Sequence, residues 1–177
     1  MSRDQVVICC GSRTLADDPR AVAWARTILA RELASATLVV AGDARGPDAW
    51  AHEIAQGMVA PIDCERWCVN GRTEYRFGAL GSWSGCGRWD DADTPTGNRR
   101  PLARNAAMVE HYRQPTDQGV TRMVAMGGGF RSINHDDCVV RLVALIDPAS
   151  RTNGTLHTVT LAWAAGIDVT EHVWRAP

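Results

Sequence analysis

Three short segments of the sequence combine glycine with arginine, and two of them add hydroxyl side chains, as anion-binding turns do. They are residues 11–14, 42–48 and 150–155, and each follows an apolar run and precedes a helical pattern. Backbone amides at such turns, together with the partial positive charge of a helix N-terminus, bind phosphate groups. One glycine-containing turn is weak evidence, because the glycine can serve the turn geometry alone. Three such turns at one edge of a sheet predict a phosphate or ribose site.

The side chains of these turns suit different parts of a ligand. Arg13 and Arg45 can each grip a phosphate with two parallel hydrogen bonds. Asp43 and Asp48 would repel a phosphate and suit ribose hydroxyls or a catalytic role, although Asp48 can instead complement the dipole of its own helix. Ser12 and Thr155 either contact phosphate oxygens or cap the helices that follow. From these turns we predict nine ligand-binding residues: Gly11, Ser12, Arg13, Gly42, Asp43, Arg45, Asp48, Gly154 and Thr155.

The periodicity of apolar residues places these turns between strands and helices. Short β-branched runs predict buried strands, and apolar residues at three- and four-residue spacing predict amphipathic helices. Asp17 or Asp18 before Pro19 marks a helix start, because the carboxylate can cap free amides and proline suits the first helical turn. The expected strands are 5–10, 37–41, 62–67, 138–146 and 167–173, and the expected helices are 18–34, 46–58, 101–112 and 154–165. This alternation predicts one α/β domain over residues 1–177, a Rossmann-like open parallel sheet with helices on both faces.

Two stretches interrupt the pattern. Residues 70–100 interleave glycines with aromatic residues and predict an insertion loop, in which Trp83 and Trp89 either cover a ligand or form an oligomer contact. Residues 120–126 fit a helix or a strand equally well, and the glycines and polar residues of 127–137 predict a second loop.

The composition excludes several classes of protein. All 19 basic residues are arginine, so no lysine is present for a Schiff base, a pyridoxal phosphate enzyme or a Walker A loop. The formal net charge of −1 provides no overall positive field for a nucleic-acid backbone or an anionic membrane. The start of the sequence has no apolar run long enough for a signal peptide, so we expect a cytoplasmic protein with reduced cysteines.

A metal site is the weaker interpretation of the cysteines. His52 with Cys64, Cys68 and Cys86 can be drawn as a zinc site, but the spacing contains no CxxC pair. Buried or incidental thiols explain the same residues, and we therefore expect no metal and no resident cofactor.

Four blocks in order resemble the SLOG superfamily, in particular its YspA-like branch. They are Gly-Ser-Arg-Thr-Leu from residue 11, Gly-Asp-Ala-Arg-Gly-Pro-Asp-Ala-Trp-Ala from residue 42, Arg-Asn-Ala-Ala-Met-Val from residue 104, and Gly-Thr from residue 154 before a helix ending in Ala-Ala-Gly-Ile. The blocks cover about 100 residues. The resemblance implies a site for a nucleotide or an NAD- or ADP-ribose-derived ligand. It also implies kinship with LOG phosphoribohydrolases, the DNA-processing protein DprA and SLOG domains that sense NAD-derived signals in antiphage defence. Arg104 and Asn105 match the LOG arginine motif, so the resemblance adds them to the predicted site, with helix capping as the alternative.

One departure from the LOG pattern bears on catalysis. Thr158 stands where the LOG motif has its essential glutamate, and a threonine cannot stabilise the positive charge that develops on the sugar during N-glycosidic cleavage. Asp43, Glu110 and His157 are the candidates to replace that carboxylate. We therefore expect a nucleotide-binding protein with a role in signalling or defence. The alternatives are a nucleoside 5′-monophosphate N-ribohydrolase with a relocated carboxylate and, less favoured by the charge, a single-stranded DNA binder. The expected partners are a nucleotide-derived small molecule and a second copy of the chain.

Overall fold

The computed structural model describes residues 4–78, 81–113, 122–126, 129–133, 138–150 and 154–176. Seven strands form one sheet in the order β5-β4-β3-β2-β1-β8-β9, and β6 pairs with β7 in a separate hairpin. The helices and strands in chain order are β1 (Asp4–Gly11), η1 (Arg13–Asp17), α1 (Pro19–Glu32), β2 (Leu38–Gly42), α2 (Pro47–Gly57), β3 (Asp63–Trp67), β4 (Arg72–Arg76), β5 (Ser84–Arg88), η2 (Gly97–Arg99), α3 (Arg100–His111), β6 (Arg122–Met126), β7 (Gly129–Ile133), β8 (Cys138–Ile146), α4 (Gly154–Ala164) and β9 (Asp168–Val173).

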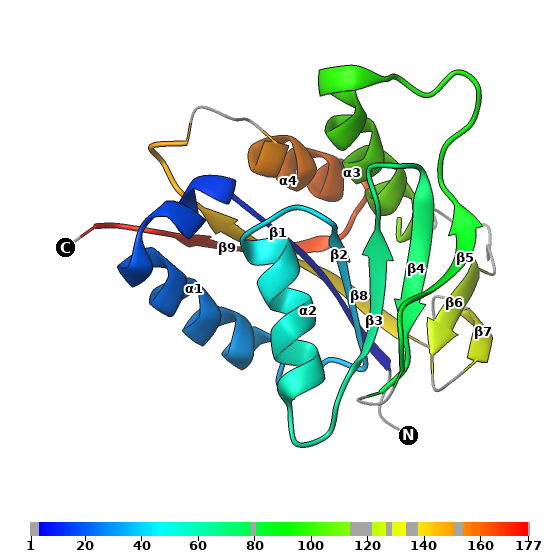
Figure 1. The fold of residues 1–177 in the computed structure, drawn as a ribbon, viewed down its shortest axis with the longest axis horizontal. Coiled ribbons are helices and arrows are strands. Elements are labelled where there is room, and N and C mark those ends of the chain that lie inside the picture. Colours follow the sequence, from blue (N-terminus) through cyan, green and yellow to red (C-terminus); the bar gives the residue numbers. More distant parts are fainter. Residues whose placement is uncertain are drawn as a thin grey trace.

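Helices cover both faces of the seven-stranded sheet (Figure 1). On one face, α1 and α2 pack on a core that includes Val7, Leu29 and Ala51. On the other face, α3 and α4 pack on a core that includes Met108 and Val159. The five strands from β3 to β9 in sheet order run parallel, as the periodicity predicts. The change of helix face falls between β1 and β8, and at such a switch point the carboxyl ends of parallel strands leave a crevice for ligands.

Two turns of the chain have a clear local cause. The Asp18 carboxylate accepts a hydrogen bond of 2.8 Å from the backbone amide of Arg20, and Pro19 opens α1, which confirms the predicted helix start. At the start of α2, Gly46 has φ of 87° and ψ of −136°, a conformation that residues with a Cβ rarely adopt. This glycine lets the chain leave β2 and enter α2 within four residues.

The expectation of a long loop over residues 70–100 is wrong in part. Residues 72–76 form β4, antiparallel to β3, and residues 84–88 form β5, antiparallel to β4, so the sheet is mixed rather than all parallel. Thr73 and Tyr75 alternate with more exposed neighbours, which is the period of two expected for a strand. The glycines at 85 and 87 hid the strand character of β5, because glycine is rare inside strands.

The expectation of a loop over residues 127–137 is also wrong in part, and the segment 120–126, which fitted a helix or a strand equally well, contains a strand. Residues 122–126 form a strand, and residues 129–133 pair with them antiparallel as a hairpin. Positions 120, 121, 127, 128 and 134–137 lie outside the described residues.

A fully buried carboxyl group lies in β3. Glu65 accepts hydrogen bonds from the indole nitrogen of Trp67, at 2.5 Å, and from the hydroxyl of Tyr112 on α3. Burial raises the pKa of Glu65 to about 7, although these hydrogen bonds oppose the shift. On the opposite face, burial and the charge of Arg66 lower the pKa of His52 to about 4.

Glu65 and His52 have opposite effects on how the free energy of unfolding changes between pH 4.5 and 7. The folded state keeps the proton on Glu65 that the unfolded state loses, so this group lowers stability as pH rises. Folded His52 has already lost its proton, so this group raises stability as pH rises towards 6.5. The amide of Glu65→Gln can accept from Trp67 and donate to the Tyr112 hydroxyl, as the protonated carboxyl does. We therefore expect the free energy of unfolding of this variant to rise by about 3 kcal/mol between pH 4.5 and pH 7, relative to that of the wild type.

Urea denaturation at the two pH values measures this effect. Glu110→Gln, at an exposed position on α3, is the control that leaves the profile unchanged. An identical pH profile for Glu65→Gln and the wild type would show that Glu65 is ionised in the folded protein at pH 7.

Candidate functional site

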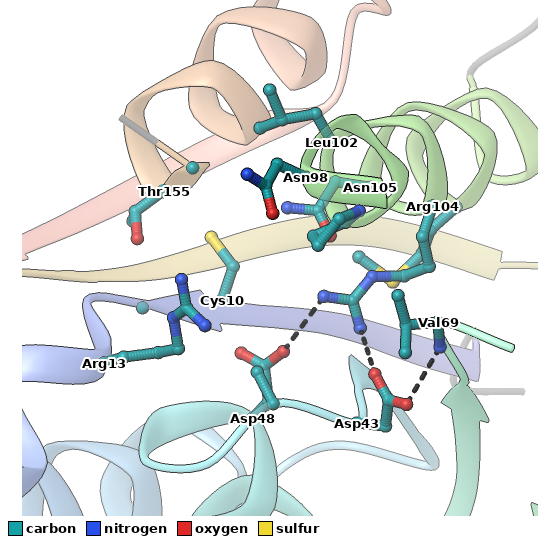
Figure 2. Close-up of a pocket in the computed structure, with 15 residues that line it drawn as sticks. Cys10, Arg13, Asp43, Asp48, Val69, Asn98, Leu102, Arg104, Asn105 and Thr155 are labelled. Atoms are coloured by element: carbon teal, nitrogen blue, oxygen red, sulfur yellow. Dashed lines mark hydrogen bonds and ion pairs between the residues drawn. The ribbon is translucent and has the colours of Figure 1, made fainter. Parts of the chain in front are cut away.

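A cavity of about 400 Å³ lies at the carboxyl edge of the sheet, where β1 and β2 end and α3 and α4 begin. Figure 2 shows Asp43 and Asp48 on one side, Arg13 near Cys10, and Thr155 and Asn105 opposite. Its lining comes from five segments that are distant in the sequence: Cys10, Gly11, Arg13, Asp43, Ala44, Asp48, Val69, Asn98, Pro101, Leu102, Arg104, Asn105, Met108, Gly154 and Thr155.

Arg104 forms the centre of an ion-pair network beneath this cavity. Its Nη1 donates to the carbonyl oxygen of Trp67 at 2.9 Å and to Oδ1 of Asp43 at 3.3 Å. Its Nη2 lies 3.7 Å from Oδ2 of Asp48, and the Arg104 side chain is only 4% exposed. Asp43 accepts a further hydrogen bond of 2.9 Å from the amide of Val69. The network ties α3 to the turn after β2.

Gly42 makes the room for this arginine. A Cβ built on Gly42 would lie 1.6 Å from Nη1 of Arg104 and 2.4 Å from Oδ2 of Asp48. The last residue of β2 is therefore part of the site because it has no side chain, and Gly42 itself is buried.

Burial changes the protonation of two groups in the cavity wall. It raises the pKa of Asp48 to about 6, while the nearby charge of Arg104 opposes the shift and that of Asp43 adds to it. Burial, followed by the charge of Asp48, also raises the pKa of Cys10 well above its ordinary value. Cys10 therefore presents a neutral thiol, and Asp48 titrates within two units of neutral pH.

Asn105 joins α3 to α4 at the far side of the cavity. Its amide nitrogen donates to Oγ1 of Thr158 at 2.8 Å, and the Thr158 hydroxyl donates to the carbonyl oxygen of Gly154 at 2.8 Å. Thr158 is fully buried. Thr158 thus links α3 to α4, and the carboxylates of the cavity come from the turn after β2 and from the first turn of α2.

Arg13 and the start of α4 form the end of the cavity that suits an anion. Arg13 is exposed, and among the described residues it has no ion-pair partner. Gly154 and Thr155 open α4, whose first amides have no partner within the helix. Residues 151–153, which belong to the third predicted turn, lie outside the described residues.

The structure places the remaining predicted residues away from this cavity. Ser12 is buried, and its hydroxyl accepts from the amide of Asp147 at 3.1 Å, so it neither lines the cavity nor caps a helix. Arg45 lies 3.4 Å from Asp17 on the surface. Glu110 lies 3.6 Å from Arg113, and His157 is exposed on α4. Of the three catalytic candidates, Asp43 is the one that lines the cavity.

Several residues that line the cavity could not be predicted from the sequence, because their residue types do not indicate a binding site. Asn98, Leu102 and Met108 come from η2 and α3. No motif marks Asn98 and Leu102, and Met108 lies in the third quoted block without having been singled out. The packing of α3 on the sheet brings all three to the cavity. The two expected lid residues lie elsewhere: the Trp89 indole donates to the carbonyl of Cys68 at 2.7 Å, and Trp83 lines a different cavity.

The residues considered for zinc do not gather in the described part of the chain. Among those residues, no group of three or more His, Cys, Asp or Glu side chains is placed to hold a metal ion. Burial raises the pKa values of Cys64 and Cys68 to about 11, so both are protonated thiols. The side chain of Cys86 is outside the described part.

The fold and cavity together define an α/β protein with a mostly parallel mixed sheet and a polar crevice at the carboxyl edge of its strands. No protein-family model, curated protein or solved structure matches the chain. Within the described residues, no helix combines the length and apolar character that crossing a membrane requires.

Proposed function

We propose that the protein binds a nucleotide or an NAD- or ADP-ribose-derived ligand in the cavity at the carboxyl edge of the sheet. The observation that carries this proposal is the division of the cavity into three chemical regions. One end has the Arg13 guanidinium and the first turn of α4, the floor has Asp43 and Asp48, and a less polar wall includes Leu102 and Met108.

Each region suits one part of such a ligand. A phosphate fits the end with Arg13, because a guanidinium and free helix amides both favour negative charge there. Ribose hydroxyls fit Asp43 and Asp48, whose carboxylates accept hydrogen bonds. A base fits against the aliphatic side chains of Leu102 and Met108. Arg104 takes the role of holding both carboxylates, rather than the direct contact with a phosphate or sugar that the resemblance implied.

The resemblance of the four sequence blocks to the SLOG superfamily supports the same ligand class. Three of those blocks contribute the cavity residues Gly11, Asp43 and Arg104, and the fourth contributes Gly154 and Thr155. On this resemblance we also propose a signalling or defence role for the bound nucleotide, and a homodimer.

Cleavage of the N-glycosidic bond is a second candidate function, and the Asp48 carboxyl group favours it. Asp48 with a pKa of about 6 and Asp43 in the same wall provide two carboxylates in different environments, which is the arrangement used for acid–base catalysis. This hydrolysis would release a free base and a ribose phosphate. Asp48 is a better candidate for the missing carboxylate than Glu110 or His157, because it lines the cavity.

Retention of a nucleotide distinguishes these functions. The purified protein is incubated with AMP, ADP-ribose, NAD and cyclic ADP-ribose isomers, ultrafiltered, and the retained and released compounds are identified by mass. Retention of an intact nucleotide supports binding, and release of base that is lost in Asp48→Asn supports hydrolysis. Retention of none of these compounds, with no base released, contradicts both.

We expect Arg13→Ala to weaken binding of the retained nucleotide by about 10- to 100-fold, because a charge-assisted hydrogen bond contributes about 1.5–3 kcal/mol. Isothermal titration calorimetry measures the change. Arg20→Ala is the matched control, since Arg20 is an exposed arginine on α1 paired with Asp18 outside the cavity. Equal affinity of Arg13→Ala and the wild type would show that the phosphate does not bind at this end of the cavity.

A further inference from the structure

A second cavity, of about 210 Å³, lies on the α2 side of the sheet. Its walls are the inward face of α2, the neighbouring residues of β3 and β4, and the indole of Trp83. The residues that line it are Gly42, Asp43, Ala49, His52, Glu53, Gln56, Arg66, Arg76 and Trp83. The sequence suggested His52 only as a zinc ligand, and His52 is not part of the proposed nucleotide site.

Polar atoms in this second cavity are buried without partners. Both ring nitrogens of His52 lack a hydrogen bond of ordinary geometry, and this residue is 6% exposed. The carbonyl groups of Ala41 and Gly42 lie near enough to oppose the lowering of its pKa, but they do not complete such a bond. The Nε atom of Arg76 and the Oε1 atom of Gln56 are also buried and unpartnered among the described residues. Leaving buried polar groups unsatisfied is costly, so several of them around one cavity indicate a missing ligand.

Contacts among the side chains that line the second cavity hold those side chains in place. Gln56 donates its amide to the carbonyl of Ile62 at 2.7 Å, which fixes Oε1 as the free acceptor. The Arg66 guanidinium lies 4.1 Å from the centre of the Trp83 ring, and His52 meets the same ring edge-on at 5.1 Å. Both contacts occupy the ring of Trp83, and the cavity measures only about 210 Å³, so the space suits a small group rather than a large aromatic ligand.

Three charged side chains of the second cavity are ion-paired, although Arg104 is shared between Asp43 and Asp48. Arg66 is paired with Glu74, Asp43 with Arg104, and Glu53 with Arg26. Arg76 has no ion-pair partner among the described residues. The neutral ring of His52 offers one N–H donor and one acceptor nitrogen, and Gln56 offers the acceptor Oε1. Together with the Arg76 guanidinium, these groups are available to a ligand.

We propose that the second cavity binds a small oxyanion that also carries a hydroxyl group, with Arg76 and His52 donating to its charged oxygen and Gln56 accepting from its hydroxyl. Dihydrogen phosphate and a short hydroxycarboxylate share this chemistry. The unpaired Arg76 charge matches a single negative charge. The hydroxyl matches the free Oε1 of Gln56, which a ligand without a donor would leave unsatisfied.

The position of Asp43 links this site to the main cavity. Asp43 lines both cavities, and Gly42 precedes it in the wall of the second. An oxyanion in the second cavity therefore lies beside the same carboxylate that faces the proposed nucleotide.

Histidine NMR tests the proposal in the intact protein. Inorganic phosphate, glycolate and acetate are titrated separately while the ring nitrogen signals of His52 are followed, assigned by their absence in His52→Gln. We expect saturable shifts with phosphate or glycolate, and the stronger of the two identifies the source of the oxyanion. We expect weaker binding of acetate, which has no hydroxyl. Acetate binding as tightly as glycolate would overturn the hydroxyl requirement, and no shift with any of the three up to millimolar concentrations would overturn the site.

Calorimetry on variants supplies the second measurement. Arg76→Gln is expected to weaken oxyanion binding about tenfold or more, whereas Arg72→Gln, at the exposed start of the same strand, leaves it unchanged. Equal weakening by both variants would place the anion outside the second cavity. Arg13→Ala separates this proposal from the nucleotide site, because it is expected to leave the His52 shifts intact, and their loss in this variant would assign them to the main cavity.

Discussion

Replacement of Arg104 by methionine is expected to lower the free energy of unfolding by about 3–5 kcal/mol, the usual cost of removing one partner from a buried ion pair. Methionine fills a similar volume, so the loss reports on charge rather than on packing. Asp48 is 6% exposed, and at neutral pH it would either stay charged without a cation beside it or take up a proton, and both are costly. The carbonyl of Trp67 would also lose its 2.9 Å donor.

Denaturation in urea measures the loss, and pH identifies its cause. Without Arg104, the pKa of Asp48 rises above its present value of about 6. The protonated carboxyl needs no cation, so the difference between variant and wild type should shrink as pH falls from above neutral towards 6 and be smallest below 6. Adding Asp48→Asn to the variant should recover part of the stability at neutral pH.

An exposed arginine provides the matched control. Arg45 pairs with Asp17 at 3.4 Å with its side chain 70% exposed, so Arg45→Met is expected to cost less than about 1 kcal/mol. If Arg104→Met also costs less than about 1 kcal/mol, the ion-pair network does not stabilise the fold and the carboxylates are solvated.

The parallel part of the sheet could be predicted because burial dictates its composition. Strands such as β1 and β8 are covered on both faces and are therefore continuously apolar, while α1 is apolar on one face only. The antiparallel extension could not be predicted in the same way. β4 is short and partly exposed, and β5 is rich in glycine, so neither carries a strong strand signal.

The position of the candidate site could be predicted, but the partners of its side chains could not. The rule that carboxyl ends of parallel strands share one edge brings Gly11, Asp43 and Gly154 to one cavity. Where a side chain points within a turn depends on one or two backbone angles. Ser12 and Arg45 stand in the same turns as cavity residues, yet one is turned inward to Asp147 and the other outward to Asp17.

Arg104 illustrates the limit most clearly. Its resemblance to a family arginine motif predicted a contact with the ligand. Arg104 does line the cavity, but its charge is taken up by Asp43 and Asp48. Both carboxylates lie more than fifty positions away in the sequence. No local pattern records such a pairing, which arises only when α3 packs against the turn after β2.

Gly42→Ala should be nearly as disruptive as loss of Arg104 itself. The added methyl carbon would occupy the position of Nη1 of Arg104, at 1.6 Å, and would also crowd Oδ2 of Asp48 at 2.4 Å. The guanidinium must leave, so we expect a loss of about 3–5 kcal/mol in the free energy of unfolding, together with loss of nucleotide binding. Urea denaturation and calorimetry with the retained nucleotide measure the two effects.

Gly57→Ala is the control that separates crowding from the general effect of replacing glycine. Gly57 ends α2, and a Cβ there would meet nothing within 4 Å. Alanine at that position restricts the unfolded chain and should be neutral or stabilising by up to about 1 kcal/mol. A Gly42→Ala variant as stable as Gly57→Ala would mean that Arg104 has an alternative position of equal energy. In that case the close approach of β2 to the guanidinium is not what holds Asp43 and Asp48 in the cavity wall.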